Sequence, residues 1–435
     1  MSDGEHTTHA GIDLDSLVDA AGGWIDRRIF CDRDIYRLEL ERIFARCWLF
    51  VAHESQISRP GDFLTTSMGE DEVIVARARD GKIHVFLNSC SHRGNRVCFA
   101  ASGSTRHFTC NYHGWSFGLD GALLGVHEEA AYRDCPTFDK SKLGLYPARV
   151  DAYQGLVFAT FDPRAPTLAE YLGDFRWYLD TLLDNDAGGT EFLPGCIRSR
   201  IRCNWKFPAE NFAGDALHAG WTHASGAMAL FGKPVRHDYE NSYHASVNGH
   251  GWEFGLDAVG NAVTMGDEVV VRDLRERAAE MERRLGPVRS RMVASIGSAT
   301  IFPNCSFLPG QPTFRVWQPR GPAEIEVQIW VLVNRAMSDD LKARYRRGVT
   351  RTFSPAGLLE MDDGENWEHA TAANAGVVTR RQKLHYGLGL GTRIAHPELR
   401  GEVHRNQVND ANQRAFYRRW LELMTAATWS EVVQR

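Results

Sequence analysis

The sequence lacks the features of a secreted, membrane-spanning or nucleic-acid-binding protein. Its start, "MSDGEHTTHAGIDLDSL", has neither the basic residues nor the apolar core of a signal peptide. No apolar run is long enough to cross a bilayer, and a net charge of −5 leaves no basic excess for nucleic acid or acidic lipid. The nine cysteines are odd in number and widely spread, unlike a disulfide framework. We therefore expect a cytoplasmic protein that binds neither nucleic acid nor membrane, with cysteines that are reduced or bound to metal.

A dinucleotide-binding fingerprint is missing as well. The stretch "GLGLG" (387–391) does not have the G-x-G-x-x-G spacing, and no clear strand precedes it. We therefore expect that the chain does not bind a nicotinamide cofactor itself.

The length of the chain and the change of residue pattern along it predict two domains. Its 435 residues exceed what one simple core holds. Residues 27–46 have the apolar spacing of an amphipathic helix, whereas strand patterns begin near Trp48, with Asp-Gly turn pairs at 80–81 and 120–121. Two prolines in 163–170 mark a boundary, beyond which helices and strands mix. We predict an α+β fold in which 1–46 is a helical part of the larger domain, 47–163 is a small all-β domain, and 164–435 is the rest of the larger domain.

Two short segments of the all-β domain each pair a cysteine with a histidine. Cys90 and His92 lie in "CSHRG", and Cys110 and His113 lie in "CNYHGW", with 17 residues between His92 and Cys110. Core cysteines beside ordinary surface histidines would be the plainest interpretation, but two such pairs at the tips of predicted hairpins are unusual. A structural zinc site is the main alternative. Zinc fingers, however, usually pair like with like, and here each loop mixes thiolate and imidazole, which suits two metal ions side by side.

These loops resemble a Rieske [2Fe–2S] centre. The pattern Cys-x-His-x17-Cys-x2-His, with "HRG" after the first histidine and "HGW" ending the second loop, carries the resemblance. It implies that Cys90 and Cys110 bind one iron and that His92 and His113 bind the other. Because neutral imidazoles replace anionic thiolates, such a cluster accepts an electron more readily than an all-cysteine one.

A second group of polar residues lies in "CNWKFPAENFAGDALHAGWTH" (203–223). If Pro208 opens a helix, Asn211, Asp215 and His218 fall on one stripe. A solvent-facing stripe is the alternative, but the flanking residues are bulky and apolar. His218 and His223 can converge on one metal if the helix ends near Gly220. A carboxylate from "GLLEMDDGENW" (357–367) would then complete the 2-His-1-carboxylate set of non-haem iron oxygenases.

These motifs together resemble the large (α) subunits of Rieske-type aromatic-ring-hydroxylating dioxygenases, of the naphthalene and biphenyl type. The resemblance implies a larger catalytic domain of antiparallel sheet covered by helices, and a mononuclear iron held by His218, His223 and Asp363. It also implies that Asp215 bridges the two metal sites and that Asn211 lies near the iron. One departure is Leu217, where the family commonly has tyrosine. Phe212, Phe353 and Leu359 flank the ligand motifs and are candidates for an apolar substrate pocket or for core packing.

The resemblance implies a terminal oxygenase that uses O₂ and two electrons to convert an arene into a cis-dihydrodiol. Electrons would come from NADH through a separate reductase, usually with a ferredoxin, to the [2Fe–2S] cluster and then to Fe(II). Family members usually assemble with a small β subunit as α₃β₃. There, the cluster of one subunit serves the iron of its neighbour through the residues equivalent to His113, Asp215 and His218.

Two alternatives stay open at this point. A Rieske monooxygenase or demethylase would have the same metals. A non-catalytic electron-transfer or zinc-stabilised binding protein would leave the set His218, His223 and Asp363 unexplained. Fused or linked aromatic hydrocarbons, or their oxygen heterocycles, are the favoured substrates because no cationic pair marks the predicted pocket.

Overall fold

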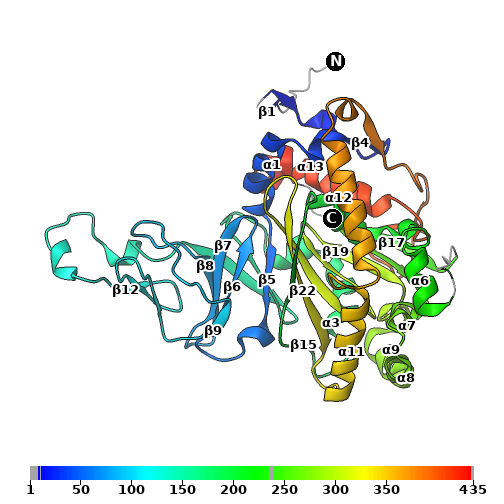
Figure 1. Cartoon of the computed structure of the whole chain (residues 1–435), viewed down its shortest axis with the longest axis horizontal. Helices are drawn as coiled ribbons and strands as arrows, with labels where there is room; N and C mark the ends of the chain where they lie inside the picture. Colours follow the sequence, from blue (N-terminus) through cyan, green and yellow to red (C-terminus); the bar gives the residue numbers. More distant parts are fainter. Residues whose placement is uncertain (1–7, 10, 233, 235–239, 433–435) are drawn as a thin grey trace. The chain divides into compact units, whose positions relative to one another are not determined.

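The computed structural model describes residues 8–9, 11–232, 234 and 240–432. The chain forms two compact units (Figure 1). The smaller unit is Phe44–Leu168, and the larger unit combines Met1–Ile43 with Ala169–Arg435. Among the described residues, no helix is both long and apolar enough to cross a membrane.

The smaller unit is built on one antiparallel sheet with strand order β5-β14-β13-β8-β7-β6-β9. The predicted Asp80-Gly81 turn joins β7 to β8: Gly81 has φ +85°, a value that glycine adopts without strain. Its strands are β5 (Leu49–His53), β6 (Asp62–Met68), β7 (Asp71–Arg77), β8 (Ile83–Leu87), β9 (Ser102–Ser104), β13 (Pro147–Tyr153) and β14 (Leu156–Thr160).

A second, three-stranded sheet carries one of the two cysteine–histidine loops. It has the order β10-β11-β12, with β10 (Phe108–Thr109), β11 (Ser116–Phe117) and β12 (Leu123–Gly125). The Cys110 loop is the β10–β11 hairpin tip, as predicted. The Cys90 loop is not a hairpin tip: it joins β8 to β9, which pair with β7, β13 and β6 rather than with each other. The sequence pattern misled because a loop between non-neighbouring strands has the same turn residues as a hairpin.

The larger unit has a long antiparallel sheet at its centre, in the order β15-β22-β21-β20-β19-β18-β17-β25-β24, with β16 also paired to β22. The predicted buried strand at 324–334 is β22 (Ile325–Asn334). The other strands are β15 (Thr190–Phe192), β16 (Ile197–Ile201), β17 (Ser242–Val247), β18 (His250–Gly255), β19 (Gly297–Ile301), β20 (Cys305–Phe307), β21 (Thr313–Pro319), β24 (Arg393–Ile394) and β25 (Glu402–Arg405).

Helices cover both faces of this sheet, as expected. On one face, Gly251 of β18 lies against Ala213 of α4 (Lys206–Gly214) and Asn412 of α13 (Ala411–Thr425). On the other face, Tyr178 of α3 (Phe175–Leu183) packs against Trp252, at 6.2 Å between ring centroids. Further helices are α2 (Leu168–Leu172), α5 (Ala216–Ala219), α6 (Ala224–Phe231), α7 (Gly260–Thr264), α8 (Glu268–Glu276), α9 (Ala278–Leu285), α10 (Pro287–Met292), α11 (Asp339–Thr352) and α12 (Glu360–Asn374).

The N-terminal segment differs from the single helix expected over 27–46. It contains a 3-10 turn (Arg27–Phe30), then α1 (Arg33–Glu39), and then a π-helical turn (Leu40–Phe44). Asp32 explains the interruption, because its side chain accepts hydrogen bonds from the backbone N–H groups of Asp34 and Ile35 and so caps a new helix. Short strands complete this region: β1 (Thr8–His9) pairs with β2 (Ile12–Asp13), and β3 (Val18–Asp19) and β4 (Trp24–Asp26) form a small sheet with β23 (Lys383–His385).

Candidate active site and metal centres

The two cysteine–histidine loops of the smaller unit come together. Cys90 and Cys110 are both buried, and the rings of His92 and His113 lie 4.5 Å apart between centroids. The loops have the same backbone pattern: the N–H of Gly94 bonds the Cys90 carbonyl, and the N–H of Gly114 bonds the Cys110 carbonyl. Both glycines have positive φ, +72° and +71°. Two matched turns thus each present a thiol and an imidazole to one site.

The chemistry of this site fits a [2Fe–2S] cluster. The Nδ1 atom of His92 is buried and has no hydrogen-bond partner among the described residues, as expected of an atom that binds a metal. Burial raises the pKa of Cys110, but N–H donors from Tyr112 and the Asn95 amide outweigh it and lower that pKa overall. A lowered pKa favours the thiolate that metal binding requires. Cys98 is also buried, with its Sγ directed at the Ala100 carbonyl.

In the larger unit, backbone breaks place the second group of polar residues. The helix begins at Lys206, two residues before Pro208, and α4 ends at Gly214. Asp215 has φ −115° and ψ 66°, so the predicted continuous stripe is broken there. The short helix α5 then ends before Gly220, as predicted, and His223 lies just before α6. These breaks turn both histidines toward the start of α12.

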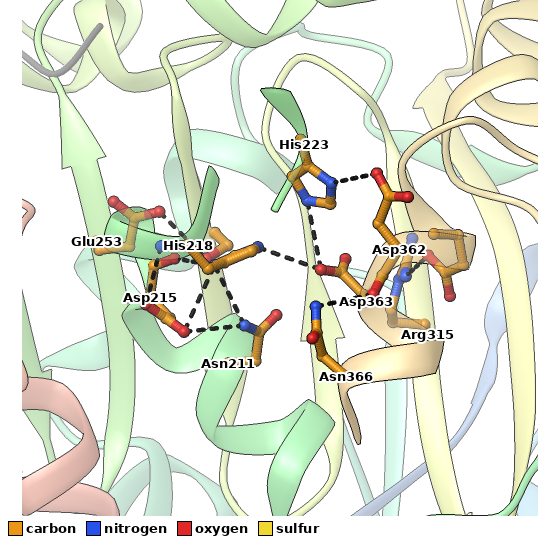
Figure 2. Close-up of polar contacts among 11 residues, drawn as sticks. Asn211, Asp215, His218, His223, Glu253, Arg315, Asp362, Asp363 and Asn366 are labelled. Carbon is orange, nitrogen blue, oxygen red and sulfur yellow. Dashed lines mark hydrogen bonds and ion pairs between the residues drawn. The ribbon is translucent and has the colours of Figure 1, made fainter. Parts of the chain in front are cut away.

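His218 and His223 converge on one carboxylate (Figure 2). Their Nε2 atoms lie 3.2 Å and 3.3 Å from the same oxygen of Asp363. One ligand atom from each of the three residues lies within 4.8 Å of the others. The Asp363 side chain is 3% exposed, so its charge has no water to balance it. Two imidazole nitrogens and a buried carboxylate facing one point form the donor set of a non-haem iron site.

The other nitrogen of each imidazole is held by an acidic residue. His218 Nδ1 contacts the Asp215 carbonyl and lies 3.5 Å from an Asp215 carboxylate oxygen. The Asn211 amide joins this group, 3.2 Å from Asp215 Oδ2 and 3.3 Å from His218 Nδ1. On the other side, His223 Nδ1 lies 3.3 Å from Asp362 Oδ2. Partners of this kind fix the orientation of metal-binding histidines.

Burial and mutual attraction set the charges of these groups. Burial alone would raise the pKa of Asp363, but hydrogen bonds and charge from His218 and His223 hold it well below its usual range. Burial opposes the charged form of His218, yet the negative charges of Asp215 and Asp363 raise its pKa well above the usual value. The buried carboxylates therefore favour a positive charge at this point, as a bound cation would supply.

A cavity of about 90 Å³ opens beside the triad. Phe212 and Phe353, for which the sequence left pocket lining and core packing both open, line this cavity. Leu359 is buried but does not line it; its Cδ2 lies against Gly226 of α6. Its position just before α12 directs it into the core, so core packing is the role that fits. The remaining lining residues are Asn211, Asp215, Ala216, His218, Ala219, His223, Glu253, Asn261, Ile296, Gly297, Ser298, Leu308, Asp363 and Gln407.

Four polar residues of the cavity wall are not among those that the sequence predicts: Glu253, Asn261, Ser298 and Gln407. They come from four different segments, and no motif joins them. The one available signal is an acid inside the otherwise apolar strand "HGWEFG" (250–255).

Known families match both units of the chain. Residues 47–139 match the Rieske [2Fe-2S] domain, and residues 168–426 match the catalytic domain of the ring hydroxylating alpha subunit. The chain belongs to the ring-hydroxylating dioxygenase α-subunit family.

Individual relatives agree with this assignment. The benzene 1,2-dioxygenase subunit alpha of Pseudomonas putida is 40% identical over 427 residues, covering 96% of this chain and 94% of the relative. The biphenyl dioxygenase subunit alpha of Paraburkholderia xenovorans is 42% identical, covering 95% and 94%. A solved structure of naphthalene 1,2-dioxygenase with indole bound superposes with a TM-score of 0.90 at 35% identity, covering 96% of this chain and 95% of that one.

As a ring-hydroxylating dioxygenase α subunit, this protein is the terminal oxygenase component of a multi-component oxidoreductase. Its cofactors are a Rieske [2Fe–2S] cluster and a mononuclear iron, and its electrons come from NADH through a reductase. Family membership thus favours the dioxygenase over the monooxygenase, carrier and zinc-protein alternatives.

Proposed function

We propose that this α subunit dihydroxylates a neutral fused-ring or linked-ring arene, either a hydrocarbon or a heterocycle, to a cis-dihydrodiol. The observation that carries the proposal is the cavity beside His218, His223 and Asp363. Its apolar wall includes Phe212 and Phe353, and none of the described residues that line it is lysine or arginine. A benzoate-type substrate would bring a carboxylate into this cavity without a cationic partner, at a high desolvation cost.

The triad would hold the mononuclear iron, which when bound supplies the open coordination positions needed for O₂ chemistry. The overall reaction joins one arene, one O₂, two electrons and two protons into one cis-dihydrodiol. The apolar wall would bind the ring and keep one of its edges facing the triad. Exclusion of bulk water by this wall would protect the reaction from side products.

We assign positioning roles to Asp215 and Asn211. Asp215 holds the Nδ1 side of His218 through its carbonyl and its carboxylate, and the Asn211 amide bonds the same carboxylate. These contacts would keep His218 Nε2 directed at the iron. By the family resemblance, Asp215 would also connect His218 to His113 of the partner subunit and so carry electrons from cluster to iron.

The same resemblance supports the partners that we propose. They are a small β subunit in an α₃β₃ hexamer, a ferredoxin and reductase that deliver electrons from NADH, and O₂ with an aromatic substrate. Cys90, His92, Cys110 and His113 would hold the cluster that receives these electrons.

Isotope labelling and metal analysis test the proposal. The purified protein should contain about three irons per chain, two in the cluster and one at the triad. With electron-transfer partners and ¹⁸O₂, a panel of neutral bicyclic arenes should yield cis-diols in which both oxygen atoms are labelled. One labelled oxygen per product would instead indicate a monooxygenase. Two irons and no turnover would indicate an electron carrier, and zinc without iron would indicate a binding protein.

A further inference from the structure

Glu253 is a buried acid in the wall of the active-site cavity. It lies in β18 directly opposite Ser298 of β19, so the two side chains share one face of the sheet. This is the face covered by α4, since the Cβ of Glu253 lies against Gly214. The neighbours Trp252 and Phe254 point to the opposite face, where both rings pack near Tyr178. The alternation of the strand therefore directs Glu253 toward the iron site.

The carboxyl group of Glu253 is held in place by two donors. Oε1 accepts a hydrogen bond from the Ser298 hydroxyl at 3.3 Å, and Oε2 accepts one from the Gln407 amide at 3.0 Å. Glu253 is only 4% exposed, and burial raises its pKa to about 8. Each carboxyl oxygen can take part in more than one hydrogen bond, so this group retains the capacity to bind a further partner.

The position of Glu253 in the cavity wall would allow this further hydrogen bond to be made to a bound substrate. Glu253, Ser298 and Gln407 line the same cavity as His218 and Asp215 (Figure 2 shows Glu253 beside these two). An acid at this place costs desolvation free energy that a leucine would not. If Glu253 served only to join β18, β19 and the 406–410 loop, its carboxyl group would not need to line a substrate cavity. Polar groups held in fixed positions in the wall of a ligand cavity usually set the orientation and identity of the ligand.

We propose that Glu253 is a specificity-determining residue that forms a hydrogen bond with a polar group of the aromatic substrate. The preferred substrates would then be arenes that carry a ring N–H, a ring oxygen or a hydroxyl group, rather than bare hydrocarbons. This inference rests on the proposed function, whose substrate class it narrows. Ser298 and Gln407 would hold the carboxyl group in position, and Phe212 and Phe353 would contact the ring.

Three bicyclic arenes of nearly the same shape make the test. Indene has no hydrogen-bonding group, benzofuran has a ring oxygen, and indole has a ring N–H. Affinities are measured on the anaerobic holoenzyme, and kcat/KM is measured with the electron-transfer partners. We expect the wild-type protein to prefer at least one heterocycle over indene by about tenfold, the value of one good hydrogen bond. Glu253→Leu should bring this ratio close to one without weakening indene binding, whereas Glu253→Gln should keep most of it.

Glu210→Gln is the matched control, because Glu210 is another buried acid but is not among the residues that line the cavity. The preference of this variant for a heterocycle over indene should equal that of the wild type. An unchanged ratio in Glu253→Leu, with iron content intact, would overturn the proposal and leave Glu253 a structural role. If the leucine variant does not fold, Glu253→Met carries the same comparison. Failure of the wild-type protein to dihydroxylate any of the three arenes would count against the proposed function, while the affinity ratios would still decide the role of Glu253.

Discussion

Asp362 and Asp363 are neighbours in sequence but have different surroundings. Asp363 is nearly inaccessible, and one of its oxygens faces both His218 and His223. Asp362 is 31% exposed in its side chain, and its Oδ2 contacts Nδ1 of His223, the nitrogen that does not face Asp363. Adjacent residues on a helix lie about 100° apart, which accounts for the difference.

We expect Asp363→Ala to lose the mononuclear iron and all turnover, because two neutral imidazoles hold a dication weakly. Asp362→Ala, its matched control, should keep most of the iron and lose activity by about 10- to 100-fold through the freed imidazole. Iron analysis, the Rieske absorbance spectrum and oxygen uptake on both variants decide this. The reverse pattern would move the ligand to Asp362, and retained iron in both would exclude the triad.

Asp215 should affect turnover more than metal content. Its carboxylate and carbonyl lie on the Nδ1 side of His218, away from the metal-facing nitrogen. We expect Asp215→Asn to retain the cluster spectrum and most of the mononuclear iron, yet to lose at least about 100-fold in turnover. Asn211→Ala removes a neighbouring contact without altering charge and should be milder. Near wild-type turnover in Asp215→Asn would exclude both the positioning and the electron-transfer role.

How far the sequence predicts this site depends on how local each signal is. Asn211, Asp215, His218 and His223 fall within one segment of 13 residues, and their spacing predicted a shared site. The acidic cluster at 357–367, which follows an apolar step, predicted the source of the third ligand, and the family resemblance pointed to Asp363 within it. Glu253 could not be predicted, since its partners come from 45 and 154 residues away. Strand register places Ser298 opposite Glu253, and the loop after β25 places Gln407 beside it.

At the scale of elements, the helix that carries Asn211 also carries a buried acid, Glu210. It accepts a hydrogen bond from the Tyr386 hydroxyl at 2.8 Å, and burial raises its pKa to about 8. An unfolded glutamate titrates near 4.3, so the folded state holds this proton more tightly than the unfolded state. The folded protein must therefore lose stability at this position as pH rises from about 4.5 toward 8.

Glu210→Gln mimics the protonated form and should remove this loss. At about pH 4.5 the variant and the wild type should have similar melting temperatures. At pH 8.5 the variant should be more stable, by up to about 5 kcal/mol. Thermal melts across this range test the prediction, with Glu276→Gln on the exposed surface of α8 as the control. A difference that does not change with pH would contradict the raised pKa.

Element boundaries were predictable where a local residue sets them and not elsewhere. The Asp-Gly turns and the break near Gly220 follow from backbone preferences of one or two residues. The early end of α4 does not, because the apolar spacing continues across it. Tertiary contacts decide such boundaries. Gly214 illustrates this: it has φ +154°, and a Cβ there would lie within 3.0 Å of Asn412, His244 and Glu253.

For the whole molecule, the proposed trimer makes cluster and iron cooperate between chains rather than within one. This can be tested with two variants that are each inactive for a different reason. Cys110→Ser should lack the cluster and keep the mononuclear iron, and Asp363→Ala should lack that iron and keep the cluster. An assembly of either variant alone lacks one kind of centre altogether. No chain, and no two neighbouring chains, then have both a cluster and a mononuclear iron.

Co-expression of the two variants should restore activity if electrons pass between subunits. In a cyclic trimer assembled at random, an interface is active only under two conditions. The chain that gives the electron must carry the cluster, and the neighbour that receives it must carry the mononuclear iron. This arrangement occurs at about one quarter of interfaces, so about one quarter of wild-type activity per interface should return. Mixing the separately purified variants, without subunit exchange, is the control and should restore none. If co-expressed assemblies of the correct size contain both centres and remain inactive, electron transfer stays within each chain, and the intersubunit role of Asp215 and His113 is wrong.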